Sequence, residues 1–258
     1  MAATGFSMTY DDFEFLEIAI EEGVATVVLN GPHDGNRLTP KGHDELVALW
    51  PRLALDDAIR AVVVTGAGDS FSEGPSPELF ATMTSGDLPY IMHVMDDIRQ
   101  MLINAIDFPK PTVAAINGTS MGGVLAFGLL NDIVVAERHV VFADRHVQAG
   151  VAAGDGGVLL WPITMGLMRA KRFLLMGDEL TAEDAERVGL ITEVVDTGAS
   201  KARAQEYAKK LAAMPVNALR YTKRGLNEWL RLALPAYNVS WGGEIMTATF
   251  TTPPGTPR

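Results

Sequence analysis

The segment Lys110–Asp132, KPTVAAINGTSMGGVLAFGLLND, constrains the fold more than any other part of the chain. It begins as an apolar run of strand length, passes through a glycine-bearing turn and continues as an apolar segment of helical length. This order predicts a buried strand that leads directly into a helix, as in α/β proteins. The turn leaves the N–H groups of Gly122 and Gly123 at the start of the helix, where a developing oxyanion could accept hydrogen bonds.

The rest of the chain repeats this alternation of strands and helices, which predicts an α/β core over residues 1–198 and a helical appendage with a tail over residues 199–258. A β-hairpin is expected at the N-terminal end, and a helix should begin at Pro40, behind a Thr39 cap, and be interrupted near Pro51. The other expected elements are the hairpin strands Phe13–Ala19 and Val24–Asn30, strands at Ala61–Thr65, Thr112–Ile116 and Asp132–Ala136, helices at Leu88–Ile106, Val216–Leu232 and Ala236–Phe250, and a disordered TTPPGTPR tail.

Composition excludes several classes of function. A net charge of −11 argues against a nucleic-acid surface, which needs clustered Lys and Arg to neutralise phosphates. No stretch approaches the roughly 18 apolar residues of a membrane span, and the N-terminus lacks the pattern of a secretory signal. The chain has no cysteine, which excludes disulfides and thiolate nucleophiles. We therefore expect a cytoplasmic protein without nucleic-acid or membrane partners.

An ionisable pair follows the glycine turn in Phe142–Gly157, FADRHVQAGVAAGDGG. His146 titrates near neutral pH and is the best candidate for a general acid or base. Asp155 could orient and charge His146. Because Asp155 lies between glycines, it suits a helix cap or a turn equally well. An oxyanion-binding turn beside an acid/base pair favours enolate or acyl chemistry.

Four motifs together resemble the crotonase (enoyl-CoA hydratase/isomerase) superfamily: KPTVAAINGTSMGG, DIVVAE, the GDGG turn and LLMGDELTAEDAERVGLITEVVD. The resemblance extends from about Phe13 to Leu226. It implies a spiral of ββα units with a C-terminal helical domain, assembled as a homotrimer or a dimer of trimers. It also implies an enzyme that binds an acyl-CoA and stabilises a thioester enolate with two backbone N–H groups.

The resemblance assigns the second of these amides to Gly123 and the first to a loop that here reads Phe71-Ser72-Glu73-Gly74-Pro75-Ser76. The position of the first donor is Pro75, which has no N–H. Losing one oxyanion donor costs about 2.7–4 kcal/mol of transition-state stabilisation. Either Gly74, Ser76 or a side chain therefore substitutes for it, or the oxyanion hole is built differently. Ser76 also replaces the family's aspartate, which puts nucleotide binding at this loop in doubt.

Both glutamates that move protons in a hydratase of this family are absent, because their positions are Ala126 and His146. Ordinary two-carboxylate hydration is therefore not expected. The pair His146 and Asp155 resembles the β-diketone hydrolase branch of the superfamily, the 6-oxocamphor hydrolase type. Glu244 falls near a carboxylate implicated in that branch, although an exposed helix face is the alternative. Phe127 is close enough to the turn to line a pocket, or it packs in the core.

Three hypotheses follow. The first is an enzyme, a lyase, isomerase or hydrolase, that stabilises an enolate or oxyanion of a carbonyl or acyl-CoA substrate. The second is a CoA-independent β-diketone C–C hydrolase that uses His146 and Asp155. The third is a catalytically inactive binding protein with the same fold. No cofactor is expected beyond coenzyme A as part of a substrate, and no group of side chains has the spacing of a metal site.

Overall fold

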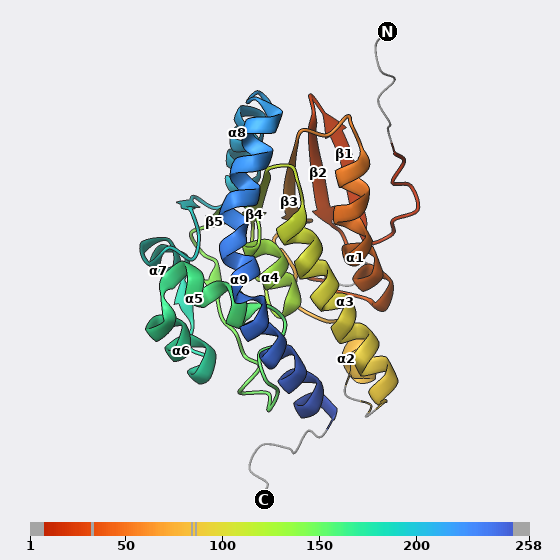
Figure 1. Ribbon diagram of the computed structural model, residues 1–258, viewed down its shortest axis with the longest axis vertical. Helices are drawn as coiled ribbons and strands as arrows, with labels where there is room; N and C mark the ends of the chain where they lie inside the picture. Colours follow the sequence, from red (N-terminus) through yellow and green to blue (C-terminus); the bar gives the residue numbers. More distant parts are fainter. Residues whose placement is uncertain (1–7, 32–33, 84, 86, 250–258) are drawn as a thin grey trace, which may run out of the picture.

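The centre of the molecule is a six-stranded sheet with the order β1-β2-β3-β4-β5-β8 (Figure 1). The computed structural model describes residues 8–31, 34–83, 85 and 87–249. The first two strands pair antiparallel, as the predicted hairpin requires, and all later pairs in this sheet are parallel. The strands are β1 (Leu16–Glu21), β2 (Val24–Leu29), β3 (Ala61–Gly66), β4 (Thr112–Ile116), β5 (Ile133–Glu137) and β8 (Glu193–Val195), with β6 (Val141–Phe142) and β7 (Leu180–Thr181) forming a separate pair.

Helices cover both faces of this sheet, so the predicted α/β class is confirmed. Successive valines of β3 alternate between two cores. Val62 and Val64 face the core that contains α1, α3 and α4, while Val63 packs against alanines of α8. The helices are α1 (Pro40–Leu55), α2 (Pro77–Met83), α3 (Leu88–Asp107), α4 (Gly123–Leu129), α5 (Gly157–Met165), α6 (Leu167–Met176), α7 (Ala182–Val188), α8 (Ser200–Ala212) and α9 (Val216–Thr249).

Two prolines do not end helices as the sequence suggested. Helix α1 begins behind its Thr39 cap, as predicted, but continues through Pro51 to Leu55. The two helices expected after residue 216 are one continuous helix, α9, which contains Pro235. Each proline removes one backbone hydrogen bond, and the packing of these helices against α3 compensates for that loss. The predicted disordered tail, 251–258, lies outside the described residues.

Helix α9 crosses the molecule and packs against both α3 and α5 (Figure 1). Its C-terminal half thereby reaches the loop between β6 and α5, which carries His146 and Asp155. Among the described residues, no helix is both long enough and apolar enough to cross a bilayer. The domain boundary after residue 198 remains a prediction, since α8 and α9 both pack against earlier elements.

Candidate active site

A cavity of about 260 Å³ lies where the loops after β3, β4 and β6 meet α1, α3 and α9. Its walls are mainly apolar, with a smaller number of polar groups among them. The apolar wall includes Leu38, Leu46, Leu79, Val94, Ile98, Met101 and Met121, and the polar groups are those of Gly74, Gly122, Gly123, His43, Arg145, His146, Asp155 and Glu244. Such a cavity suits an apolar substrate with one reactive polar group.

Backbone contacts hold the loops after β3 and β4 side by side. Asn117, at the end of β4, donates from Nδ2 to the backbone oxygens of Gly66 and Gly68 and accepts the N–H of Gly66. The Ser72 N–H donates to the Thr119 oxygen at 2.9 Å. A Cβ at Gly118 would lie 1.8 Å from the backbone oxygen of Asp69, so only glycine permits this approach. The two loops therefore reach the same cavity.

The structure distinguishes the candidate oxyanion donors. Ser76 has already committed its polar groups: its N–H donates to the Leu38 oxygen at 2.8 Å, and its Oγ accepts the N–H of Leu79. Ser76 is fully buried and does not line the cavity. Gly74 lines the cavity at a φ of +88°, which favours glycine. Gly123 opens α4, so its N–H has no acceptor within the helix. Gly74 and Gly123 are therefore the available pair.

Two further positions on α4 face away from the cavity. Phe127 is completely buried, and its ring centroid lies 5.4 Å from that of Trp50, so the predicted pocket role does not agree with its position in the core. Ala126 packs toward Gly156, where an added Cβ would lie 2.8 Å from the Ala126 Cβ. Gly156 therefore permits the close approach of the turn to Ala126.

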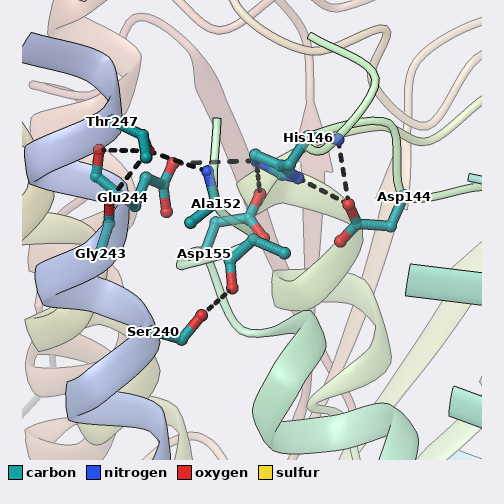
Figure 2. A network of polar contacts seen from close by, with 9 residues as sticks. Asp144, His146, Ala152, Asp155, Ser240, Gly243, Glu244 and Thr247 are labelled. Atoms are coloured by element: carbon teal, nitrogen blue, oxygen red, sulfur yellow. Dashed lines mark hydrogen bonds and ion pairs between the residues drawn. The ribbon is translucent and has the colours of Figure 1, made fainter. Parts of the chain in front are cut away.

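His146 lies at the centre of three carboxyl groups (Figure 2). Its Nδ1 is 2.8 Å from Oδ1 of Asp144, which also accepts the His146 backbone N–H at 3.1 Å. Its Nε2 is 3.1 Å from Oδ2 of Asp155 and 3.8 Å from Oε1 of Glu244. Among the described residues, Oδ2 of Asp155 has no hydrogen-bond partner. Its contact with His146 Nε2 is therefore an ion pair, and the oxygen keeps a lone pair that can accept a proton. The predicted pairing of His146 with Asp155 agrees with this geometry.

The loop reaches this arrangement by reversing its direction after Arg145. The N–H groups of Ala149 and Val151 donate back to the oxygens of Arg145 and His146. The returning segment of the loop is held by two residues of α9 (Figure 2). The Ala152 N–H donates to Thr247 Oγ1 at 2.9 Å, and the Ser240 hydroxyl donates to the Ala153 oxygen. Asp155 thus lies beside His146. It is no helix cap, since the N-cap of α5 is Gly156.

Glu244 approaches His146 because residue 154 is glycine. A Cβ at Gly154 would lie 2.2 Å from Oε2 of Glu244 and 2.6 Å from its Cβ. Glu244 is only 3% exposed, so the alternative of an exposed helix face is wrong. Its Oε2 has no hydrogen-bond partner among the described residues. Such a buried, unpaired carboxyl oxygen is rare in a purely structural role.

Burial and charge set the protonation states of this cluster. Burial alone would lower the pKa of His146, but Asp155 and Asp144 outweigh it and raise that pKa well above its ordinary value. Burial and the charge of Asp155 raise the pKa of Glu244 to about 8. At neutral pH the imidazole is therefore positively charged and Glu244 carries a proton. Asp155, next to the glycine turn, is the carboxyl group left to act as a base.

Asp144 was not among the site residues predicted from the sequence, because the adjacent Arg145 offers it a local ion pair. Arg145 instead forms an ion pair with Glu179. Asp144 accepts the backbone N–H of His146 and contacts its ring nitrogen Nδ1. An aspartate two residues before a candidate histidine was the available signal. A histidine of α1, His43, also lines the cavity and is 5% exposed. Burial lowers its pKa, so it is neutral near pH 7.

Asp144, His146 and Asp155 also have ligand atoms within 4.8 Å of one another, as a metal site would require. The direct contact of 2.8 Å between His146 and Asp144 leaves no room for an ion between those two atoms. The same arrangement serves better as an orienting hydrogen bond for the imidazole.

Residues 19–243 match the family model described as Enoyl-CoA hydratase/isomerase. A 1,2-epoxyphenylacetyl-CoA isomerase of Escherichia coli K12 is 31% identical over 215 residues, which cover 83% of this chain and 82% of the relative. An enoyl-CoA hydratase/isomerase structure from Mycobacterium paratuberculosis has a TM-score of 0.88 at 32% identity, covering 93% and 96% of the two chains. A β-diketone hydrolase from Anabaena sp. PCC 7120, bound to (S)-3-oxocyclohexyl acetic acid, has a TM-score of 0.84 at 28% identity, covering 92% and 95%.

Proposed function

The chain belongs to the enoyl-CoA hydratase/isomerase family, and we propose that it forms and uses the enolate of an apolar acyl thioester. One observation carries this proposal: a chain of polar contacts, Asp144–His146–Asp155, ends in the cavity beside the glycine turn. A Cβ on Gly122 or on Gly123 would lie 3.9 Å from Oδ2 of Asp155. A base and a pair of candidate oxyanion donors therefore share one small space.

In the proposed reaction, the N–H groups of Gly123 and Gly74 donate to the carbonyl oxygen of the substrate. Asp155 removes a proton from the carbon next to the carbonyl, and the electron pair moves onto the oxygen, where the two amides stabilise the enolate. Protonated Glu244 or His146 then donates a proton to a carbon of the enolate, which completes an isomerisation. The positive imidazole of His146 lies beside Asp155, with its Nε2 3.1 Å from Oδ2 of Asp155.

Two features support an acyl-CoA as the substrate. The cavity wall is mainly apolar, which suits the acyl part of a thioester. The Escherichia coli relative is, by its name, an isomerase of 1,2-epoxyphenylacetyl-CoA. Isomerisation also fits the absence of the two hydratase glutamates at Ala126 and His146, because it needs no activated water. A trimeric or hexameric assembly and a cytoplasmic location remain predictions.

Hydrolysis of a β-diketone is the second candidate, favoured by the His146–Asp155 pair and by the likeness to the Anabaena hydrolase. Here Asp155, paired with the positive imidazole of His146, would accept a proton from water as the water oxygen attacks one carbonyl. The C–C bond to the central carbon then breaks, and the electron pair forms an enolate on the second carbonyl. A proton from Glu244 or His146 completes the ketone product.

Exchange of substrate protons with D₂O separates these candidates, because it reports enolate formation whatever product follows. We suggest NMR measurements with an enoyl-CoA, an arylacetyl-CoA and a cyclic 1,3-diketone, on the wild type and Asp155→Asn. The proposal predicts exchange next to a thioester carbonyl that Asp155→Asn slows by about 10²–10⁴. His139→Ala, at an exposed histidine on the loop after β5, is the matched control and should not change the rate.

Each alternative has its own outcome. Ring opening of the diketone without exchange of any thioester supports the hydrolase, and titration with free CoA should then show no binding. An inactive binding protein would give neither exchange nor cleavage with any of the three compounds. Exchange that is equally fast in Asp155→Asn would remove Asp155 from the mechanism.

A further inference from the structure

A second group of histidines and carboxylates lies between α1 and α3, outside the catalytic cluster. His43 and Asp44 come from the first turn of α1, and Asp97 comes from α3. Ligand atoms of these three residues all lie within 4.8 Å of one another. His93, one turn before Asp97 on α3, brings its Nε2 to 3.5 Å from the same Asp97 oxygen that faces His43.

The distances in this group differ from those of a hydrogen-bonded pair. His43 Nδ1 is 3.8 Å and His93 Nε2 is 3.5 Å from Oδ2 of Asp97, whereas His146 Nδ1 lies 2.8 Å from its aspartate. In a tetrahedral zinc site with bonds of about 2.0–2.1 Å, neighbouring ligand atoms are about 3.3–3.4 Å apart. Each histidine nitrogen is therefore only slightly farther from the Asp97 oxygen than two ligands of a shared ion would be.

The charges of this group are also uncompensated. Among the described residues, neither Asp44 nor Asp97 forms a salt bridge with a Lys or Arg side chain. Partial burial together with the negative charge of Asp44 and Asp97 raises the pKa of the neighbouring Tyr90 hydroxyl. Asp97 is partly buried beside the buried imidazole of His43, and a divalent cation would supply a positive charge there.

We propose that His43, Asp97 and His93, with Asp44 beside them, bind a divalent transition-metal ion of the zinc class. Two imidazole nitrogens and two carboxylate oxygens are a donor set that zinc accepts. The ion would join α1 to α3, whose spacing is already fixed by the bond from Asn104 Nδ2 to the Val47 oxygen at 3.2 Å.

From the sequence alone, no group of side chains was expected to have the spacing of a metal site. The two halves of the proposed site are about 50 residues apart, and neither His-Asp nor His-x₃-Asp is distinctive alone. Only the packing of α1 against α3 brings them together. Since His43 also lines the catalytic cavity, the ion would stiffen one wall of that cavity.

Titration with ZnCl₂ tests this site on protein first stripped with EDTA and dialysed. Calorimetry should show about one ion bound per chain, and CoCl₂ in its place should give the visible absorption bands of four-coordinate cobalt. The double variant His93→Ala/Asp97→Asn should weaken zinc binding by at least about tenfold. Both positions are partly exposed, so this variant should fold, which circular dichroism verifies.

Two controls locate the ion. His139→Ala removes a histidine that lies 3.8 Å from a single carboxylate, Glu137, and should leave zinc affinity unchanged. Asp144→Asn alters the catalytic cluster and should also leave the stoichiometry unchanged. Absence of stoichiometric zinc binding would overturn the proposal. Equal affinity in the double variant and the wild type would overturn it too, as would loss of the ion in Asp144→Asn alone.

Discussion

Replacing Glu244 with glutamine should change how the stability of the protein depends on pH. The Glu244 carboxyl is buried next to Asp155, and its pKa is raised from 4.5 to about 8. Between these two values the folded protein holds a proton that the unfolded chain has released. Stability therefore falls as pH rises through this window, because the folded state binds more protons. Glutamine cannot ionise, so the Glu244→Gln variant should not show this part of the fall.

The size of the effect follows from the difference between the folded and unfolded pKa values of Glu244. A tenfold change in an acid dissociation constant corresponds to about 1.4 kcal/mol. Integrated from pH 5 to pH 8, a rise from 4.5 to about 8 gives a loss of about 3–4 kcal/mol in the free energy of unfolding. The raised pKa of His146 adds a further loss as pH rises through its folded value. Because His146 is present in both proteins, the difference between wild type and variant isolates Glu244.

Urea denaturation at pH 5, 6, 7 and 8 measures this difference directly. The free energy of unfolding of Glu244→Gln, relative to the wild type, should rise by about 3–4 kcal/mol across the series. Glu228→Gln, at an exposed glutamate of the same helix, is the matched control and should run parallel to the wild type. Parallel curves for Glu244→Gln and the wild type would refute the reasoning that Glu244 is protonated in the folded protein.

Three further predictions concern the same cluster. Asp155→Asn should lower kcat by about 10²–10⁴ on the substrate that undergoes exchange, and an unchanged kcat would contradict its role as the base. Asp144→Asn should lower the pKa of His146, so the alkaline limb of the rate profile should move to lower pH; an unmoved limb would show that Asp144 does not control the imidazole. Gly154→Ala should destabilise the protein by about 1–3 kcal/mol, because the new Cβ would collide with Glu244. In a Glu244→Gly background, which removes the Cβ of residue 244 as well, most of that loss should disappear, and an equal loss in both backgrounds would locate the strain elsewhere.

The fold was predictable because its signals are local. The run Lys110–Asp132 encodes a strand, a turn and a helix by apolar length and glycine position alone, and the structure has β4 and α4 there. The prolines at 51 and 235 were misleading because their cost is local, whereas the packing that outweighs it comes from α3, which no local pattern describes.

The catalytic cluster was predictable only in part. His146 and Asp155 are close in sequence, and one loop brings them together. Asp144 was missed because its direction depends on the chain reversal after Arg145. Glu244 is almost 90 residues from Asp155 and was suggested only by the family resemblance; its burial depends on the space left by Gly154. Ser76 and Phe127 are close to site residues in the sequence, but the Ser76 N–H donates to the Leu38 oxygen and the Phe127 ring packs on Trp50. Only the three-dimensional contacts reveal this.

A crystal structure of the protein with a bound carbonyl ligand tests the proposed chemistry most directly. The ligand would be the thioester or diketone that exchanges its protons, held in the Asp155→Asn variant to prevent turnover. The mechanism predicts a carbonyl oxygen within about 2.7–3.1 Å of the backbone nitrogens of Gly123 and Gly74, and the acidic carbon next to residue 155. A carbonyl oxygen beyond reach of both amides, with the acidic carbon turned away from residue 155, would contradict it.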